Sequence, residues 1–257
     1  WYRTIPPYLI ALLVYSVLFS KFDLDTLKYL FFVQNVSESF TNFEYFYVAW
    51  SLAIEEFFYL LFPIFLIFLN KNKFVNITLL FIFLVYLIKI FYLTFEISEE
   101  FYRIGTFLRL DSIAFGILIR VFFEKIRNNL LNLISIFLIC LIMVYFKNKL
   151  NALGSLDLFG FVLLSQVISI NIIIIFINCN KFLTNHLLQR IFSLFSKQTY
   201  SIYLFHFAII YLIDVNKFFL DAKWLFLFYL TSLFLFATLF YYTLEKIIID
   251  NRPSYKE

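Results

Sequence analysis

The sequence predicts an all-α fold, a polytopic bundle of about eight membrane helices, and three observations lead to this class. Of the 257 residues, 63% are hydrophobic, and the mean hydropathy is +0.89. The apolar residues are grouped in long runs, and a membrane helix needs about 17–25 of them. Only 4 Gly and 4 Pro are present to interrupt these runs. An ordinary soluble domain, in which about half of the residues are apolar, is therefore excluded.

Eight apolar runs are long enough, or nearly so, to cross a bilayer. They cover residues 5–20, 50–70, 74–94, 104–123, 129–146, 156–178, 199–214 and 224–246. The longest connection, residues 21–49, is amphipathic in its first half, and the pattern leaves open whether it lies on the bilayer or re-enters it. No loop has room for a soluble domain, so residues 1–257 are expected to form one integral-membrane domain.

The basic residues predict the orientation. With eight spans, both ends of the chain lie on one side of the membrane, and twelve of the 21 Lys and Arg residues are on that side, against seven on the other. Cytoplasmic loops carry the excess of Lys and Arg, so both ends are predicted to be cytoplasmic. Lys89 and Arg109 lie within spans. The formal net charge of +4 gives no indication of nucleic-acid binding.

The second run carries two adjacent carboxylates, Glu55 and Glu56, just inside the interface marked by Trp50. A charge at membrane depth costs about 3 kcal/mol even on mild scales, so such residues face a protein interior, a partner or a watery cavity. Adjacent helical residues point about 100° apart, so one carboxylate can face the bundle while the other reaches the headgroups. The alternative is that both extend to the interface.

The fourth run contains Arg109 and Asp111 in its outer half. Residues two apart lie on nearly opposite helix faces, so each is expected to pair with another helix, and Glu55 is the candidate partner of Arg109. A structural ion pair and a functional site fit this pattern equally well. Gly116 shares a face with Arg109 and is expected to let another backbone approach closely.

The seventh run places Tyr200, Tyr203 and His206 at every third position. A neutral imidazole there can relay a proton or bind a hydroxyl. Alternatively, His206 is a buried histidine hydrogen-bonded to a neighbouring helix. His186 is expected in a cytoplasmic loop, and Glu245, at the cytoplasmic end of the last run, is expected to be solvated.

Five segments, in order along the chain, resemble the acyltransferase-3 family of multi-span membrane enzymes that O-acylate glycans and related acceptors. They are RTIPPY, WSLAIEEFFY, RLDSIAFG, TYSIYLFH and the Glu245 that follows Tyr241 and Tyr242. The family's E-x-P sequence is not matched, because Glu245 is followed by Lys246 and Ile247. The family's upstream Arg and His have no counterpart here either. The chain is therefore expected to lack the family's first two membrane helices. It would then contain the channel through the membrane rather than the whole catalytic apparatus.

The resemblance implies an O-acyltransferase of the bacterial inner membrane. It would take an acyl group, typically acetyl, from acyl-CoA on the cytoplasmic side and pass it to a hydroxyl of a cell-surface glycan or lipid-linked sugar. No bound cofactor and no metal are expected; acetyl-CoA is the donor substrate. The expected catalytic residues are Glu55, Arg109, Asp111 and His206. The residues expected to contact substrates are Arg3, Trp50, Tyr59, Tyr200 and Tyr203.

Two other functions use the same features. One is a transporter whose buried charges bind a substrate or proton, although paired broken helices and inverted repeats are not visible in the sequence. The other is a structural subunit that serves only as a scaffold. The sequence does not indicate the acceptor, the acyl chain or the oligomeric state.

Overall fold

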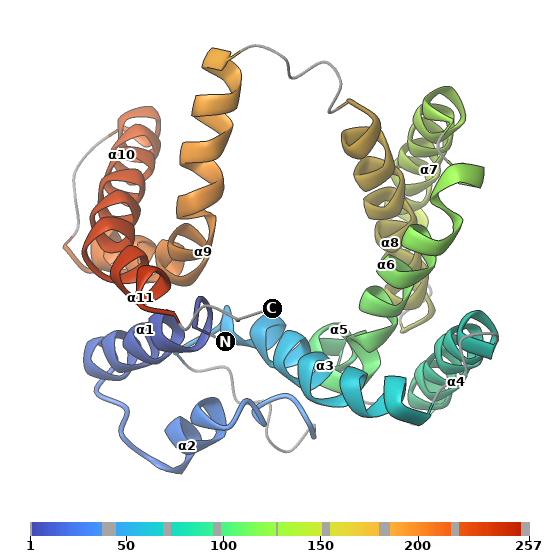
Figure 1. Cartoon of the computed structure of the whole chain (residues 1–257), viewed down its shortest axis with the longest axis horizontal. Helices are drawn as coiled ribbons and strands as arrows, with labels where there is room; N and C mark the ends of the chain where they lie inside the picture. Colours follow the sequence, from blue (N-terminus) through green and yellow to red (C-terminus); the bar gives the residue numbers. More distant parts are fainter. Residues whose placement is uncertain are drawn as a thin grey trace. The chain divides into compact units, whose positions relative to one another are not determined.

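The fold is described from a computed structural model, shown in Figure 1. The structure describes residues 2–37, 45–68, 73–94, 99–126, 128–150, 155–179, 186–216 and 221–252. Every regular element in these ranges is a helix, which confirms the predicted fold class. The chain divides into two compact units, each described here by itself. Unit 1 comprises Trp1–Phe31, Asn42–Ala49 and Thr184–Glu257, and unit 2 comprises Phe32–Thr41 and Trp50–Leu183.

Each predicted apolar run coincides with a helix. Four stretches in the described ranges are long and apolar enough to cross a membrane: Phe74–Tyr92, Gly160–Asn178, Leu188–Val215 and Ala222–Asp250. Two shorter apolar helices cover Ile5–Leu18 and Leu131–Ile142. The two remaining runs correspond to α3 (Ala49–Phe68) and α6 (Thr106–Ile126), which carry ionisable residues within their apolar sequence.

Unit 1 is organised around an aromatic core and a long helix. Its elements are α1 (Ile5–Leu18), α2 (Leu24–Leu30), α9 (His186–Val215), α10 (Ala222–Phe240), the π-helical η4 (Tyr241–Glu245) and α11 (Lys246–Asp250). The ring of Phe46 stacks on those of Tyr8 and Tyr15, with centroids 5.3 and 4.5 Å away. Within the connection that follows α1, Asp23 caps the short helix α2 by accepting hydrogen bonds from the backbone amides of residues 25 and 26.

Helix α9 is longer than predicted and is interrupted by a side chain from α1. It begins at His186. This histidine was predicted to lie in a loop, but it lies in the first turn of the helix. The Tyr15 hydroxyl donates to the backbone oxygen of Leu204 and accepts from the amide of Ala208, at 3.0 Å in each case. A side chain inserted into the hydrogen-bond ladder bends a helix, and Figure 1 shows α9 changing direction along its length.

In its described residues, unit 2 contains six helices: α3, α4 (Phe74–Thr94), α5 (Glu99–Ile104), α6, α7 (Asn129–Leu150) and α8 (Ser155–Cys179). Helix α6 packs against α4 and α8, and α7 packs against α8. The short helix α5 is followed by Gly105, where a Cβ atom would lie 2.8 Å from the backbone oxygen of Phe101, too close for another residue type. Helix α6 then begins with the Thr106 amide donating to the backbone oxygen of Asn35, at 2.9 Å. This carbonyl satisfies one of the amides that a helix start leaves without an intrahelical acceptor.

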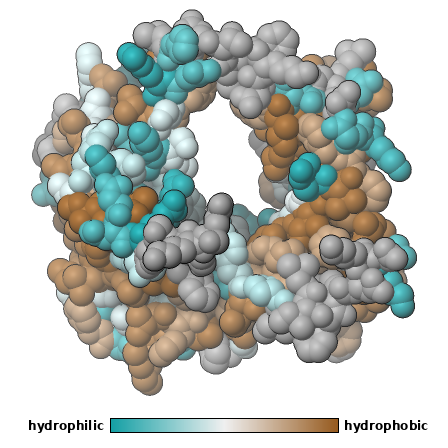
Figure 2. All heavy atoms as spheres, viewed as in Figure 1, coloured by the Kyte–Doolittle hydropathy of each residue, from teal (hydrophilic) through white to brown (hydrophobic). Residues whose placement is uncertain are grey.

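The outer surface of both units is strongly apolar. In α4, large side chains such as Leu80, Phe83 and Phe91 are exposed. Figure 2 shows hydrophobic residues over much of the face in view. A soluble monomer rarely exposes apolar patches of this extent, whereas helices surrounded by lipid do. Several polar side chains, among them Lys89, Asp111 and Glu245, are instead buried between the helices.

Candidate functional site

A buried ion pair joins two membrane helices in unit 2. The Nζ atom of Lys89, on α4, lies 2.5 Å from Oδ2 of Asp111, on α6. Both side chains are fully buried, with relative exposures of 1% and 0%. The Lys89 ammonium also lies 4.8 Å from the centre of the Tyr86 ring. Because the attraction between opposite charges is strongest where water is excluded, this pair holds α4 and α6 in register.

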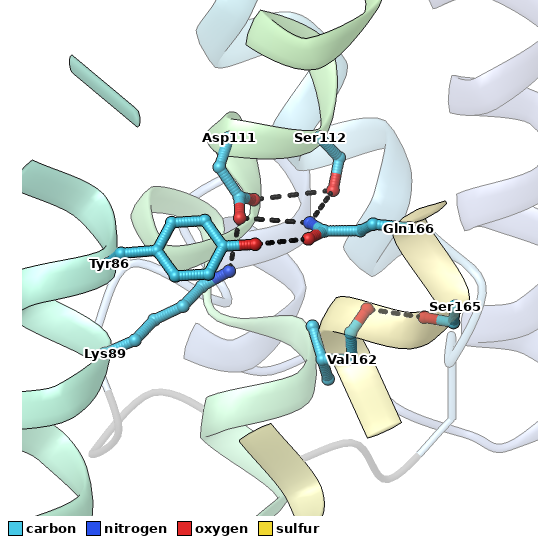
Figure 3. Close-up of polar contacts among 7 residues, drawn as sticks. All are labelled: Tyr86, Lys89, Asp111, Ser112, Val162, Ser165 and Gln166. Carbon is cyan, nitrogen blue, oxygen red and sulfur yellow. Dashed lines mark hydrogen bonds and ion pairs between the residues drawn. The ribbon is translucent and has the colours of Figure 1, made fainter. Parts of the chain in front are cut away.

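A third helix completes the network, as Figure 3 shows. Gln166, on α8, donates from Nε2 to Asp111 Oδ2 at 3.0 Å and to the Ser112 hydroxyl at 2.9 Å. Its Oε1 atom accepts a 2.7 Å hydrogen bond from the Tyr86 hydroxyl. Both halves of the Gln166 amide are thus used, which also fixes which way round the amide lies. We call these five residues, Tyr86, Lys89, Asp111, Ser112 and Gln166, the α4–α6–α8 network.

One positive charge beside the network has no ion pair among the described residues. Arg109, half-buried on α6, interacts electrostatically with Tyr86 and Lys89. Within the described residues, it forms no ion pair. Lys89 and Asp111 neutralise one another, so among the described residues the guanidinium is the charge in this region without an ion pair. Such a region favours an anion or an oxygen that becomes negative during a reaction.

The predicted pairing of Glu55 with Arg109 is wrong. No ion pair joins them in the part of the chain that the structure describes, and Asp111 is bound by Lys89 instead. Glu55 is exposed and Glu56 is half-buried. The reason is geometric: Asp111 on α6 bonds to Lys89 on α4 and Gln166 on α8, whereas Glu55 is an exposed residue of α3. The predicted role of Glu55 in catalysis remains a prediction.

Gly116 also does not behave as expected. A Cβ atom built there would meet nothing within 4 Å, so no backbone approaches it closely. It lies on the exposed face of α6, whereas Asp111 and Ala114 lie on the buried face. The glycine that a close contact does require is Gly105, at the junction of α5 and α6.

The three predicted residues on α9 belong to unit 1. The Tyr200 hydroxyl donates to the backbone oxygen of Thr4 at 2.8 Å, and the Tyr203 hydroxyl donates to that of Val48 at 3.0 Å. These two phenols connect α9 to the start of α1 and to the segment before α3. His206 is half-buried, and its Nδ1 atom lies 2.8 Å from the backbone oxygen of Tyr203. With Nδ1 donating to that oxygen, a neutral imidazole carries its lone pair on Nε2, the atom that can accept a proton.

Glu245 was expected to be solvated, and this is wrong. Its relative exposure is 1%, and the buried hydroxyl of Ser201 donates a very short hydrogen bond to Oε1. Its Oε2 atom has no hydrogen-bond partner among the described residues. Glu245 is the last residue of the π-helical segment, and such local widening, which shifts the direction of the following side chains, is common at functional sites.

The remaining predicted substrate contacts lie near the helix ends. Arg3 is exposed, and its Nη2 atom lies 3.5 Å from the Ser196 backbone oxygen, at the limit of a hydrogen bond. Arg3 also attracts Glu245 electrostatically. Trp50 is half-buried at the start of α3, and Tyr59 is exposed further along it. The described residues contain no group of three or more His, Cys, Asp or Glu side chains placed to hold a metal ion.

A comparison with known families assigns the chain. The acyltransferase-3 family model, described as an acyltransferase domain, matches residues 2–245. The chain belongs to the acyltransferase-3 family. Searches of curated proteins and of solved structures gave no match. The match includes both units, so the α4–α6–α8 network and the buried Glu245 are both parts of this acyltransferase domain.

Sequence analysis of this acyltransferase missed most of the network. Lys89 was visible as a cation within a span, but a single sequence gives no sign of the helix on which its partner lies. Gln166 is a polar residue in an otherwise apolar run, and that contrast was the available signal. Tyr86 and Ser112 had no such signal, because tyrosine and serine are tolerated in membrane helices without a polar partner.

Proposed function

We propose that this protein is a membrane-embedded O-acyltransferase that moves an acyl group, typically acetyl, from acyl-CoA to a hydroxyl of a cell-surface glycan or lipid-linked sugar. The match of the acyltransferase domain to residues 2–245 carries the proposal. The apolar helices and the charges buried between them support a reaction that takes place within the membrane.

The chemistry has two requirements. A sugar hydroxyl is a weak nucleophile until a base removes its proton. When it attacks the thioester carbonyl, the carbonyl oxygen becomes negative and needs a hydrogen-bond donor or a positive charge. Collapse of that intermediate breaks the carbon–sulfur bond, releases CoA and leaves the acyl group on the sugar oxygen.

Arg109 is our candidate for stabilising the negative oxygen. Its charge is not neutralised by an ion pair within the described residues, whereas Lys89 and Asp111 neutralise one another. A guanidinium next to a saturated ion pair keeps its donors available for a substrate. Asp111 acts in this proposal as a positioning residue, since Lys89 and Gln166 already occupy its Oδ2 atom.

Glu55 and His206 are the candidates for handling protons. His206 has its Nε2 lone pair available as a base when Nδ1 donates to Tyr203. Glu55 would orient or charge a proton-accepting histidine, as its match to the family segment implies. Arg3 is the candidate for the phosphates of the donor, on the side of the membrane that we propose to be the bacterial cytoplasm.

The direct test uses membranes that contain the protein expressed from its complete gene. Radiolabelled acetyl-CoA is added, and both its consumption and the label on surface glycan are measured. We expect Arg109→Gln to lower the transfer rate by about 100-fold or more, the usual effect of losing one oxyanion donor. The matched control is Arg120→Gln, which removes an exposed arginine from the other end of α6 and should leave the rate within a factor of two or so.

The outcomes separate the competing functions. An acyltransferase consumes acetyl-CoA and labels the glycan, and Glu55→Gln lowers both. A transporter leaves acetyl-CoA intact. Full activity in Glu55→Gln would remove Glu55 from the mechanism, and full activity in Arg109→Gln would refute the role proposed for Arg109.

A further inference from the structure

Three buried polar residues lie close along the backbone at the start of α6, and their side chains carry polar atoms without a hydrogen-bond partner among the described residues. Asn35 and Thr106 have relative exposures of 0%, and Tyr102 has one of 3%. Both polar atoms of the Asn35 amide, the Thr106 hydroxyl and the Tyr102 hydroxyl lack a hydrogen-bond partner among the described residues. Buried polar groups in native proteins are nearly always hydrogen-bonded, so these atoms are expected to bind a further polar group.

The backbone brings these residues together. The Thr106 amide donates to the Asn35 backbone oxygen at 2.9 Å, so the two residues adjoin. Tyr102 lies four residues before Thr106, on α5, and Gly105 makes the junction between them. The contact of Gly105 with the Phe101 backbone leaves no room for a side chain at this junction. All three residues belong to unit 2.

The chemistry of the three side chains indicates their ligand. An amide offers donors and an acceptor, and each hydroxyl offers one donor and accepts as well. Burial raises the pKa of the Tyr102 phenol, which lies on α5 outside the predicted spans, so this group keeps its proton. All three groups are therefore neutral. A hydroxyl, which both donates and accepts, can satisfy all three groups.

We propose that Asn35, Tyr102 and Thr106 form a binding site for a neutral hydroxyl-bearing group, either an ordered water or a hydroxyl of a sugar. Arg109 lies three residues after Thr106 and so on a neighbouring position of the same side of α6. A hydroxyl held here lies beside the guanidinium charge of the candidate site. The sugar as source rests on the proposed acyl transfer, whereas the site itself does not.

The first test is the sign of a stability change in the purified protein. Thr106→Val and Tyr102→Phe each remove one hydroxyl and keep the shape of the side chain. If nothing binds there, removing an unpaired buried hydroxyl leaves the melting temperature unchanged or raises it. If a hydroxyl-bearing group binds, the variants lose a hydrogen bond, and each Tm should fall by about 2–4 °C.

The calibrating variant is Thr78→Val. Thr78 is also a buried threonine of unit 2, but its hydroxyl donates to the backbone oxygen of Phe74 at 2.8 Å. Its Tm change gives the effect of losing a hydroxyl that is known to be bonded. Thr106→Val should match it in sign. A Tm that is unchanged or raised in both Thr106→Val and Tyr102→Phe overturns the proposal, and Tyr102→Phe alone decides if Thr106→Val fails to fold.

The second test identifies the source of the hydroxyl, with glucose as the probe. Glucose stabilises proteins non-specifically, and this non-specific rise of Tm is equal in the wild type and in Thr106→Val. A larger rise of Tm in the wild type supports the site with a sugar hydroxyl as its ligand. An equal rise, together with the lowered Tm of the variants, supports the site with water as its ligand. Neither readout needs enzymatic activity, so failure of acyl transfer would be recognised separately by intact acetyl-CoA.

Discussion

Each of the two units buries a carboxylate, and the two carboxylates differ in how fully their oxygens are hydrogen-bonded. Asp111, in unit 2, accepts hydrogen bonds from Lys89 and Gln166 and faces a full positive charge. Glu245, in unit 1, accepts from the Ser201 hydroxyl, and its second oxygen has no hydrogen-bond partner among the described residues. A saturated carboxylate fixes the positions of its neighbours, whereas a half-satisfied one still has capacity to bind. Burial of an acidic residue therefore does not by itself distinguish a structural role from a functional one.

The largest effect is expected from removing the positive partner in unit 2. Lys89→Met leaves Asp111 as an uncompensated buried charge, and losing one partner of a buried pair costs about 3–5 kcal/mol of stability. Thermal unfolding of the purified protein in detergent measures it. Adding Asp111→Leu to Lys89→Met should restore most of the loss, because apolar residues can replace a whole buried pair. Lys125→Met, which removes an exposed lysine of the same unit, is the control, and an equal loss there would contradict this account.

The junction that precedes the network gives the next effect. Gly105→Ala places a Cβ atom 2.8 Å from the Phe101 backbone oxygen, so the junction must shift. We expect a loss of about 1–3 kcal/mol, typical of overpacking. Gly116→Ala is the matched control on the same helix, because a Cβ atom meets nothing within 4 Å there. Alanine is favoured over glycine within a helix by about 0.5–1 kcal/mol, so this variant should be more stable than the wild type. Equal changes of stability at the two glycines would show that the close contact at Gly105 does not cause the loss.

Unit 1 can be tested at the hydroxyl that interrupts α9. Tyr15→Phe removes the group that links the Leu204 oxygen to the Ala208 amide, and both backbone groups then lose their partner. Leaving buried polar groups unsatisfied costs about 1–3 kcal/mol. Tyr242→Phe removes the hydroxyl of an exposed tyrosine in the same unit and should change little. An unchanged Tm in Tyr15→Phe would indicate that α9 closes its own hydrogen bond when the hydroxyl is absent.

The smallest effect is expected at the carboxylate of unit 1. Making the same change at the carboxylate of unit 2 compares the two units directly. In Glu245→Gln the new amide oxygen can still accept from Ser201, so stability should change by about 1 kcal/mol or less. The same chemical change in unit 2, Asp111→Asn, leaves Lys89 without its counter-charge and should cost several times more. If the two variants lose equal stability in thermal unfolding, the distinction between a saturated and a half-satisfied carboxylate fails.

Hydropathy was sufficient to predict the long helices but not their full extent. The run at 74–94 was predicted residue for residue, because apolar length alone defines a membrane helix. The start of α9 at His186 was missed, since Gln189, Arg190 and Lys197 lower the local hydropathy although they are good helix formers.

Partner choice could not be predicted in the same way. Sequence spacing excluded a pair between Arg109 and Asp111, and the structure contains none in the described residues. Spacing could not show that α4, rather than α3, packs on the Asp111 face of α6, because this depends on the arrangement of whole helices. Glu245 was expected to be solvated from its place near the end of a run, and the π-helical turn that carries it into the protein has no signal in a single sequence.

The buried lysine on α4 has a consequence for how the protein enters the membrane. Lys89 leaves the ribosome 22 residues before Asp111, so its helix is complete before its counter-ion has been synthesised. A lone lysine at the centre of a membrane helix opposes insertion by about 2.5–3.5 kcal/mol, and Lys89, in the last third of α4, opposes it by less. Helices α4 and α6 are therefore best delivered to the lipid together, after they have met at the translocon. Because of this order of synthesis, the Lys89–Asp111 pair contributes to membrane insertion as well as to the folded state.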